Sequence, residues 1–129
     1  MMKKFLILMA LLFFTSTASA EIKIYTGVGE YYLDPSMTMD YAKQKAKIDA
    51  ERNAQEQAYV YVRNHSTTKN AMLSEDEIET ITVGIIKVMD VKYYIMAAED
   101  NIFLIRAIVK AEIDTDEIPK WIEKIEQEG

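Results

Sequence analysis

The sequence predicts an α+β fold of two layers, in which a long alanine-rich helix packs on one face of an antiparallel sheet of about three strands. Two periodicities support this prediction. Alanine recurs every four residues from Ala42 to Ala58, the spacing of one face of a helix. Apolar residues then recur at every second position from Phe103 to Ile113, the spacing of one face of a strand. The predicted order of elements is β-α-α-β-β-α.

The first twenty residues have the pattern of a secretory signal peptide. Lys3 and Lys4 give a basic start, residues 5–14 are uninterruptedly apolar, and Ala18-Ser19-Ala20 is a small-residue cleavage signature. The apolar run is too short to cross a bilayer as a helix, which takes about 20 residues. We therefore expect residues 1–20 to be a signal peptide and residues 21–129 to form one domain. This domain is expected to be exported, periplasmic or extracellular, and without a stable membrane anchor after cleavage.

Charge and cysteine content exclude several classes of function. The chain has 129 residues and a formal net charge of −6, and the signal peptide contributes only basic charges, so the mature chain is more acidic still. An acidic domain is a poor match for the nucleic-acid backbone, so no nucleic acid is expected as a partner. The absence of cysteine excludes disulfides, thiolate ligands and a lipid-modified cysteine. The core must therefore be stabilised by apolar burial.

The first element after the signal is predicted to be a strand over residues 21–33. Its β-branched and aromatic residues alternate in part with polar ones. Gly27 and Gly29 lie inside this strand, which predicts either a bulge or a close approach of another backbone. Asp34-Pro35-Ser36 then ends it.

The longest element is predicted to be a helix from Thr38, its expected N-cap, to about Asn64. Its alanine row, extended by Met39, Val60 and Tyr61, is expected to face the sheet. Three polar side chains project near this apolar face, and we treat them as a candidate buried polar cluster: Asp49, Asn53 and Gln57. Buried amides need hydrogen-bond partners. Two interpretations are open: the cluster satisfies backbone groups of loops or helix ends, which is favoured, or it binds a ligand.

A polar connection over residues 64–73 is predicted to lead into a second helix. Ser74 and Glu77 form a capping-box pattern, and Gly84 is the expected C-cap. Two strands, residues 85–97 and 102–113, are then expected to form a hairpin around residues 98–101.

The last strand predicts a candidate interaction surface. Its first set of alternating residues, from Phe103 to Ile113, is apolar and expected to face the helices, whereas the intervening set faces outward. Ile102, Leu104 and Ile108 are on the outward side. A terminal helix follows, with an apolar stripe that includes Trp121. Two arrangements are open: the outward residues, with Trp121, form an exposed patch that binds a partner or a second copy, or the terminal helix folds over them and buries Trp121 there.

No constellation of catalytic or metal-binding residues is evident. His65 is the only histidine and lies in the polar connection, where it is expected to be solvated. The acidic clusters at residues 75–77 and 114–117 lack the loop pattern of a calcium site and coincide with helix starts. We therefore expect no catalytic residues, no metal, no cofactor and no enzymatic activity.

A family resemblance extends over residues 40–113. The pattern Ala42-x3-Ala46-x2-Asp49-Ala50-x2-Asn53-Ala54-x2-Gln57-Ala58 is followed by Leu73-Ser74-x-Asp76-x-Ile78 and by Gly84-Ile85. It resembles the N-terminal domain of the flagellar assembly protein T (FlgT-like), and is similar to small exported lipoproteins of the Lpp-twenty type. The resemblance implies a compact α/β domain that acts in assembly of the cell envelope, without catalysis. The missing lipidation cysteine and the end of the chain after one domain depart from those relatives.

Two functional hypotheses follow. The first is a non-enzymatic interaction or assembly module of the bacterial cell envelope that binds a protein partner or itself as a homo-oligomer. The second is a domain that binds small molecules or cell-wall glycans with tyrosine surfaces, for which the candidates are Tyr25, Tyr31, Tyr32, Tyr93 and Tyr94. Adjacent tyrosines on a strand point to opposite faces, so at most one of each pair lines a common surface.

Overall fold

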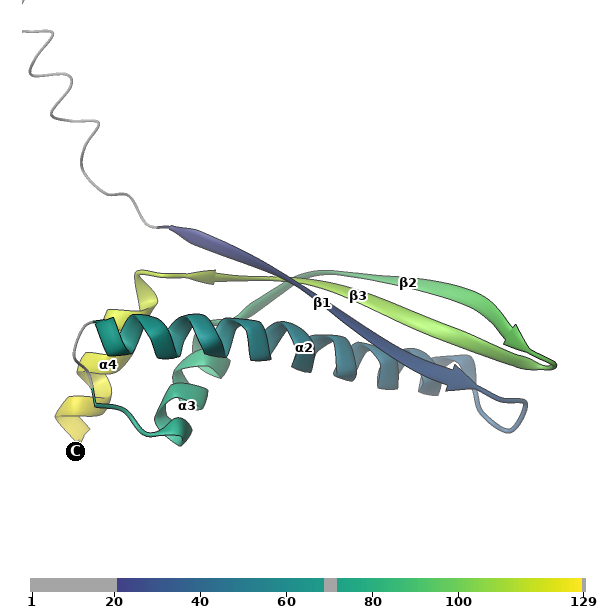
Figure 1. Cartoon of the computed structure of the whole chain (residues 1–129), viewed down its shortest axis with the longest axis horizontal. Coiled ribbons are helices and arrows are strands. Elements are labelled where there is room, and N and C mark those ends of the chain that lie inside the picture. The colour runs from purple at the N-terminus through teal and green to yellow at the C-terminus, as the bar shows by residue number, and fades with distance from the viewer. Residues whose placement is uncertain (1–20, 69–71, 129) are drawn as a thin grey trace, which may run out of the picture.

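The computed structural model describes residues 21–68 and 72–128 and confirms the predicted α+β class. The predicted signal peptide lies outside the described residues. The elements are β1 (Ile22–Leu33), α2 (Met39–Thr68), α3 (Glu75–Ile85), β2 (Lys87–Glu99), β3 (Ile102–Asp114) and α4 (Glu117–Glu128). The strands form one antiparallel sheet in the order β1-β3-β2. Figure 1 shows α2 running along one face of this sheet, with α3 and α4 gathered at the end where α2 finishes.

The alanine row of α2 faces the sheet as predicted. All five alanines from Ala42 to Ala58 are completely buried. The row continues through Val62, which is also buried, and not through Val60, which is 44% exposed. The helix begins after Thr38, whose hydroxyl accepts a hydrogen bond from the Tyr41 amide at 3.2 Å. It ends at Thr68, four residues beyond the predicted end, so the first half of the predicted polar connection is helical.

Gly27 and Gly29 let the backbone of α2 lie directly against the backbone of β1. A Cβ atom added to Gly27 would lie 2.0 Å from the carbonyl oxygen of Ala50. One added to Gly29 would lie 2.2 Å from the carbonyl oxygen of Ala46. The register of β1 on β3 is continuous, so the close approach is the correct alternative and a bulge in β1 is not. The register shifts occur in β2, between Val88 and Asp90 and between Ala97 and Glu99.

The core has two parts along α2. One joins the alanines of α2 to Leu33 and to the inward residues of β3, which are buried from Ile105 to Ala111. The other joins the end of α2 to α3, α4 and the end of β3, around Ile81, Ile113 and Ile118. Phe103 begins the inward set of β3 but is 43% exposed, because it lies beyond the start of the helix layer.

Of the two predicted ends of α3, the first is confirmed and the second is wrong. The capping box of α3 is present: Ser74 Oγ accepts from the Glu77 amide at 3.2 Å, and a Glu77 carboxylate oxygen accepts from the Ser74 amide at 2.9 Å. The prediction that Gly84 caps the other end is wrong. No described glycine has positive φ, α3 continues through Ile85, and Gly84 instead makes room for the Trp121 ring.

Replacing Gly29 by Ala is expected to destabilise the fold by about 3 kcal/mol, because the added methyl group meets helix backbone, which moves only if α2 lifts off the sheet. Thermal or urea unfolding measures the loss. Gly84→Ala is the comparison variant: its methyl group would lie 2.5 Å from the Trp121 ring, a side chain that can shift where helix backbone cannot, so a smaller loss is expected. Equal losses in the two variants would contradict direct backbone packing at Gly29.

Candidate functional site

The face of the sheet opposite α2 is the candidate interaction surface. We call it the open face, because among residues 21–68 and 72–128 no helix or strand packs on it (Figure 1). On β3 it consists of the even-numbered residues from Ile102 to Glu112, which alternate with the inward core residues. Their partners in the ladders place the even-numbered residues of β1 from Ile22 to Tyr32, and Lys92, Tyr94 and Met96 of β2, on the same face.

Three of the four predicted surface residues lie together on the open face. Ile102, Leu104 and Ile108 are half-buried there on one side of the central strand, with Arg106 between Leu104 and Ile108. They are flanked by residues that we did not predict as part of a surface. Val28 pairs with Ile108 and is 45% exposed, and Tyr32 pairs with Leu104 and is 62% exposed. Met96 of β2 flanks Leu104 on its other side.

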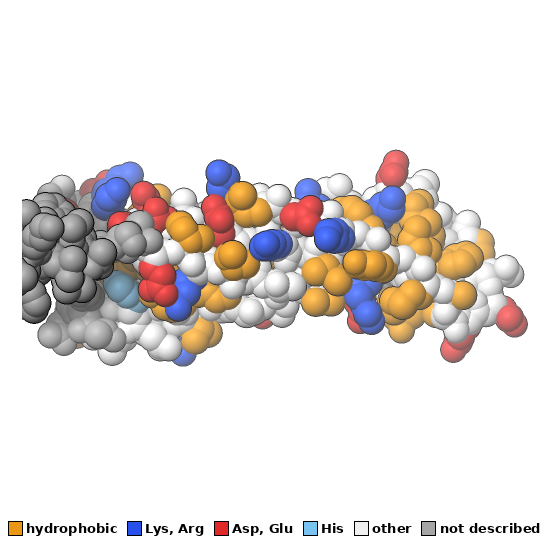
Figure 2. Space-filling view, turned by 90° about the horizontal axis from the view of Figure 1, so that it is seen from above, with side chains coloured by type: hydrophobic (Ala, Val, Ile, Leu, Met, Phe, Trp, Pro, Cys, Tyr) orange, Lys and Arg blue, Asp and Glu red, His pale blue; other side chains and the backbone are white. Residues whose placement is uncertain are grey.

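We call this group the apolar tract: Val28, Tyr32, Met96, Ile102, Leu104 and Ile108. Figure 2 looks onto the open face and shows hydrophobic side chains gathered toward the hairpin end of the sheet, with charged side chains among and beside them. The alternation of β1 already contained the signal for Val28 and Tyr32. What the sequence did not give is the strand order that places β1 beside β3.

Trp121 does not belong to this surface, and the arrangement in which α4 covers the outward residues is wrong. Residues 115 and 116 alone join β3 to α4, and the chain turns toward the helix side of the sheet. Ile118 and Ile122 are buried in the core there, and the Trp121 ring lies against Gly84 of α3. The apolar tract is therefore left uncovered by α4.

An ion pair lies within the open face. The Arg106 guanidinium donates from Nε and Nη2 to one carboxylate oxygen of Glu30, at 2.9 and 2.8 Å. Both side chains are more than one-third exposed, so the pair contributes little to stability. Glu30 lies between Val28 and Tyr32 on β1, and Arg106 lies beside Tyr94 of β2. The ion pair thus places a polar group inside the apolar tract, where it can fix the orientation of a protein that binds there.

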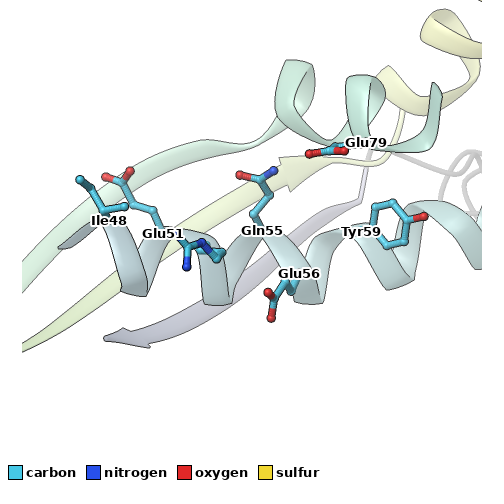
Figure 3. Close-up of a pocket in the computed structure, with 7 residues that line it drawn as sticks. Ile48, Glu51, Gln55, Glu56, Tyr59 and Glu79 are labelled. Carbon is cyan, nitrogen blue, oxygen red and sulfur yellow. The ribbon is translucent and has the colours of Figure 1, made fainter. Parts of the chain in front are cut away.

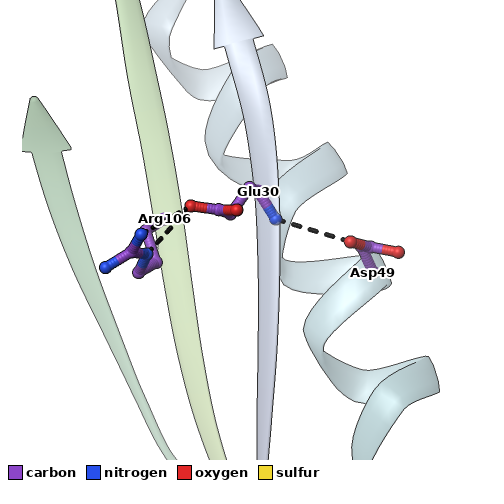
Figure 4. A network of polar contacts seen from close by, with 3 residues as sticks. All are labelled: Glu30, Asp49 and Arg106. Carbon is purple, nitrogen blue, oxygen red and sulfur yellow. Dashed lines mark hydrogen bonds and ion pairs between the residues drawn. The ribbon is translucent and has the colours of Figure 1, made fainter. Parts of the chain in front are cut away.

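The candidate polar cluster is exposed, not buried, and it binds the backbone of β1. The Val28 amide donates to Asn53 Oδ1 at 3.1 Å, and the Glu30 amide donates to Asp49 Oδ2 at 3.4 Å (Figure 4). Gln57 Nε2 donates to the Thr26 carbonyl oxygen at 2.8 Å. The three side chains do bond to backbone groups, but the backbone is that of an edge strand and not of a loop or helix end, as the favoured interpretation had it.

This arrangement protects the outer edge of β1. An edge strand presents unpaired N–H and C=O groups at alternate residues, which attract other strands. Three successive turns of α2 supply side chains to three such residues, so α2 takes the place of a fourth strand. Asp49, Asn53 and Gln57 are thereby occupied with structure, which weighs against a ligand site at this cluster.

The candidate tyrosines divide between the two faces. Tyr25, Tyr31 and Tyr93 are half-buried on the helix side and pack against the core. Burial raises the pKa of Tyr25, with smaller effects of Tyr61 and Glu21. A hydrogen bond with Tyr41, whose ring lies edge-on at 5.9 Å, is the main cause that raises the pKa of Tyr31.

Tyr32 and Tyr94 are exposed on the open face. They lie on the two outer strands, with β3 between them. Tyr32 also lines a hollow of about 670 Å³ at the hairpin end, together with Glu99 and Ile102. They are the only two of the five candidate tyrosines whose rings are available to a ligand on one common face.

A second hollow lies away from the open face, between the outer side of α2 and α3. It has a volume of about 480 Å³ and is lined by Ile48, Glu51, Arg52, Gln55, Glu56, Tyr59 and Glu79. Figure 3 shows the Gln55 side chain of α2 pointing toward α3, where Glu79 lies. In the part of the chain that the structure describes, no three histidine or acidic side chains are grouped closely enough to hold a metal ion.

His65 is on the last turn of α2 and not in a loop. Its ring lies 5.9 Å from that of Tyr61, and Nε2 is buried without a hydrogen-bond partner among the described residues, so the prediction of a solvated histidine is wrong.

No protein-family model matches the sequence, and no curated protein matches it either. The resemblance to the FlgT-like domain therefore rests on the motif residues alone. Among the described helices, none is long and apolar enough to cross a membrane.

Asn53→Ala is expected to speed hydrogen exchange of the Val28 amide and to destabilise the protein by about 1 kcal/mol, because the amide loses its acceptor on α2. Exchange followed by NMR, residue by residue, measures this effect. Asn53→Asp replaces the amide oxygen with a carboxylate oxygen that can also accept the hydrogen bond, so it should leave Val28 protected. Unchanged exchange in the alanine variant would show that Asn53 does not guard the edge.

Proposed function

We propose that this protein is an exported, non-enzymatic interaction module of the bacterial cell envelope, which binds a protein partner or a second copy of itself through the open face. The observation that carries the proposal is the apolar tract. Tyr32 and Val28 are 62% and 45% exposed, and they adjoin Leu104 and Ile108 on the central strand. Apolar side chains gathered on one uncovered sheet face are typical of a surface that another protein covers.

The composition of the open face fits a protein better than other partners. Aromatic, methionine and arginine side chains are enriched at the centres of protein interfaces, and Tyr32, Met96 and Arg106 lie close together here. The face also carries Glu30, Lys92, Lys110 and Glu112, so neither sign of charge dominates as it would in a site for a polyanion. A face of this mixed composition matches the surface of another folded protein.

Two inferences from the sequence support the cellular setting. The predicted signal peptide leads to export, and the motif residues that resemble the FlgT-like domain imply a role in envelope assembly. Neither depends on the open face, so the binding proposal and the location are tested separately.

A second candidate function is the binding of a small molecule or a cell-wall glycan by stacking on tyrosine. The observation that favours it is that Tyr32 and Tyr94 share the open face and that Tyr32 lines the hollow at its hairpin end. Sugar rings stack on exposed aromatic faces. A thermal-shift screen against cell-wall glycans tests this alternative. A shift that Tyr32→Ala abolishes would support it, and the absence of any shift would count against it.

A photoreactive amino acid at Leu104 is expected to form a cross-linked protein adduct in living cells, because Leu104 lies at the centre of the apolar tract. The same amino acid at Glu56, on the outer side of α2, is the matched control and should form none. The adduct is detected as a shifted band and identified by mass spectrometry. An adduct at Glu56 but not at Leu104 would place the interface elsewhere.

Leu104→Asp separates the two kinds of partner. If the adduct is a second copy, light scattering should show an oligomer whose mass Leu104→Asp reduces. If the adduct is another protein, Leu104→Asp should leave the molecular mass of this protein unchanged and should abolish only its binding to that partner. The absence of any adduct in every strain background, together with a mass that Leu104→Asp leaves unchanged, would refute binding through the open face.

A further inference from the structure

The two edge strands of the sheet differ in whether side chains are hydrogen-bonded to their outer backbone groups. At β1, three side chains of α2 are hydrogen-bonded to the outer backbone groups of Thr26, Val28 and Glu30. At β2, in the ranges 21–68 and 72–128, no side chain makes a hydrogen bond to the backbone of residues 90–97. One edge is therefore guarded and the other is available to a further strand.

The ladder determines which backbone groups β2 offers. In an antiparallel sheet, residues alternate between those that bond to the neighbouring strand and those whose N–H and C=O point away from it. The outer groups of β1 belong to Thr26, Val28 and Glu30, so their partners on β3 direct their own groups toward β2. On β2 the outward groups therefore belong to the odd-numbered residues of its regular part: Val91, Tyr93 and Ile95.

The helix layer stops short of β2. The core alanines of α2 pack against β1 and β3, and the helix-side residues of β2 remain partly uncovered. Ile95 is 51% exposed and Val88 is 42% exposed, although both point to the helix side of the sheet. An added strand would cover these side chains at the same time as it satisfied the free backbone groups.

We infer that β2 pairs antiparallel with β2 of a second copy, about a two-fold axis at Tyr93. This register sets Val91 opposite the second copy's Ile95, which makes two apolar cross-strand pairs on the helix side. It also sets Lys87 at each end opposite the second copy's Glu99, a pair of opposite charges. All three outward residues then lie in hydrogen-bonded positions of the new ladder.

The irregularities of β2 favour this register over its neighbours. The strand is bulged between Val88 and Asp90 and again between Ala97 and Glu99, almost equally far from Tyr93. A two-fold axis at Tyr93 therefore sets bulge against bulge and regular strand against regular strand. A two-fold axis at Ile95 would set Asp90 opposite the second copy's Asp100, and the two carboxylates would repel each other. An axis at Val91 would set the bulge between Val88 and Asp90 opposite the second copy's regular strand at Tyr93, which would interrupt the new ladder.

The product is a six-stranded sheet in which the two open faces are continuous and the guarded β1 strands form both outer edges. This pairing does not rest on the proposed function, because it uses the backbone edge of β2 and leaves the apolar tract free.

The test compares Ile95→Pro with Ile95→Thr. Both variants are expressed from the full-length sequence, including residues 1–20, and are purified after any processing by the cell. Proline removes the outward N–H of residue 95, which β3 does not use, whereas threonine keeps it. Light scattering over a concentration series is expected to show a dimer for the wild type and for Ile95→Thr. Ile95→Pro is expected to weaken the dimer by at least about tenfold, because it deletes one backbone hydrogen bond from each copy.

A second measurement does not depend on how well the proline variant folds. The chain has no cysteine, so Lys92→Cys accepts a single nitroxide label. In the inferred register, residue 92 and its copy are diagonal neighbours about 7–8 Å apart, and the label should show strong dipolar broadening. A label at Glu56→Cys, on the outer side of α2, is the control and should show none.

The outcomes separate this pairing from the open-face proposal. A dimer weakened by Ile95→Pro but not by Leu104→Asp, together with broadening at residue 92, supports edge pairing. A dimer abolished by Leu104→Asp and unchanged by Ile95→Pro overturns edge pairing and supports association through the open face. A monomer at every concentration, with no broadening at residue 92, overturns edge pairing whether or not Leu104 cross-links to another protein.

Discussion

Direct contact between the backbones of α2 and β1 is the constraint on which the rest of the structure depends. It requires the absence of side chains on both sides, which Gly27 and Gly29 provide on the strand and the buried alanines provide on the helix. In a domain without disulfides, such packing brings many atoms into van der Waals contact within a thin core. It also fixes the position of α2 across the sheet, because the two glycines of β1 are where the helix backbone lies directly against the strand.

The hydrogen bonds from α2 to the edge of β1 follow from that closeness. Asp49 and Asn53 have short side chains, and they reach strand amides only because the helix axis lies against β1. Glu30 shows how the layers are connected: its amide donates to Asp49 of α2, and its carboxylate accepts from Arg106 of β3 (Figure 4). The three polar residues Asp49, Asn53 and Gln57, for which the sequence leaves a ligand site open, therefore complete the sheet at its edge.

The sequence predicted those features that depend on local periodicity. The alanine row, the capping box at Ser74 and the alternation of β3 each follow from residues close together in the chain, and each is present. What it missed depends on contacts between distant segments. Gly84 looked like a helix cap because nothing nearby in sequence indicates that the Trp121 ring would lie against it. Asp49, Asn53 and Gln57 looked buried because their partner strand lies at the sheet edge, and the strand order is not encoded in any local pattern. Trp121 was grouped with Leu104 because a helical stripe does not show to which side of the sheet the chain turns after Asp114.

The bare surfaces of this protein are a consequence of having one long helix for three strands. A helix is about 10 Å wide with its side chains, and neighbouring strands are about 4.8 Å apart, so one helix covers two strands well and a third poorly. The glycines and the polar caps hold α2 over β1 and β3, and β2 consequently keeps both a free backbone edge and partly exposed apolar side chains such as Ile95. A helix placed centrally would cover β2 but leave the edge of β1 unguarded. With one long helix and three strands, one edge of the sheet is left free, and in this protein that edge is β2. It is the one whose ends are bulged and oppositely charged, Lys87 at one and Glu99 at the other, and whose regular middle, around Tyr93, is suited to pairing with another strand.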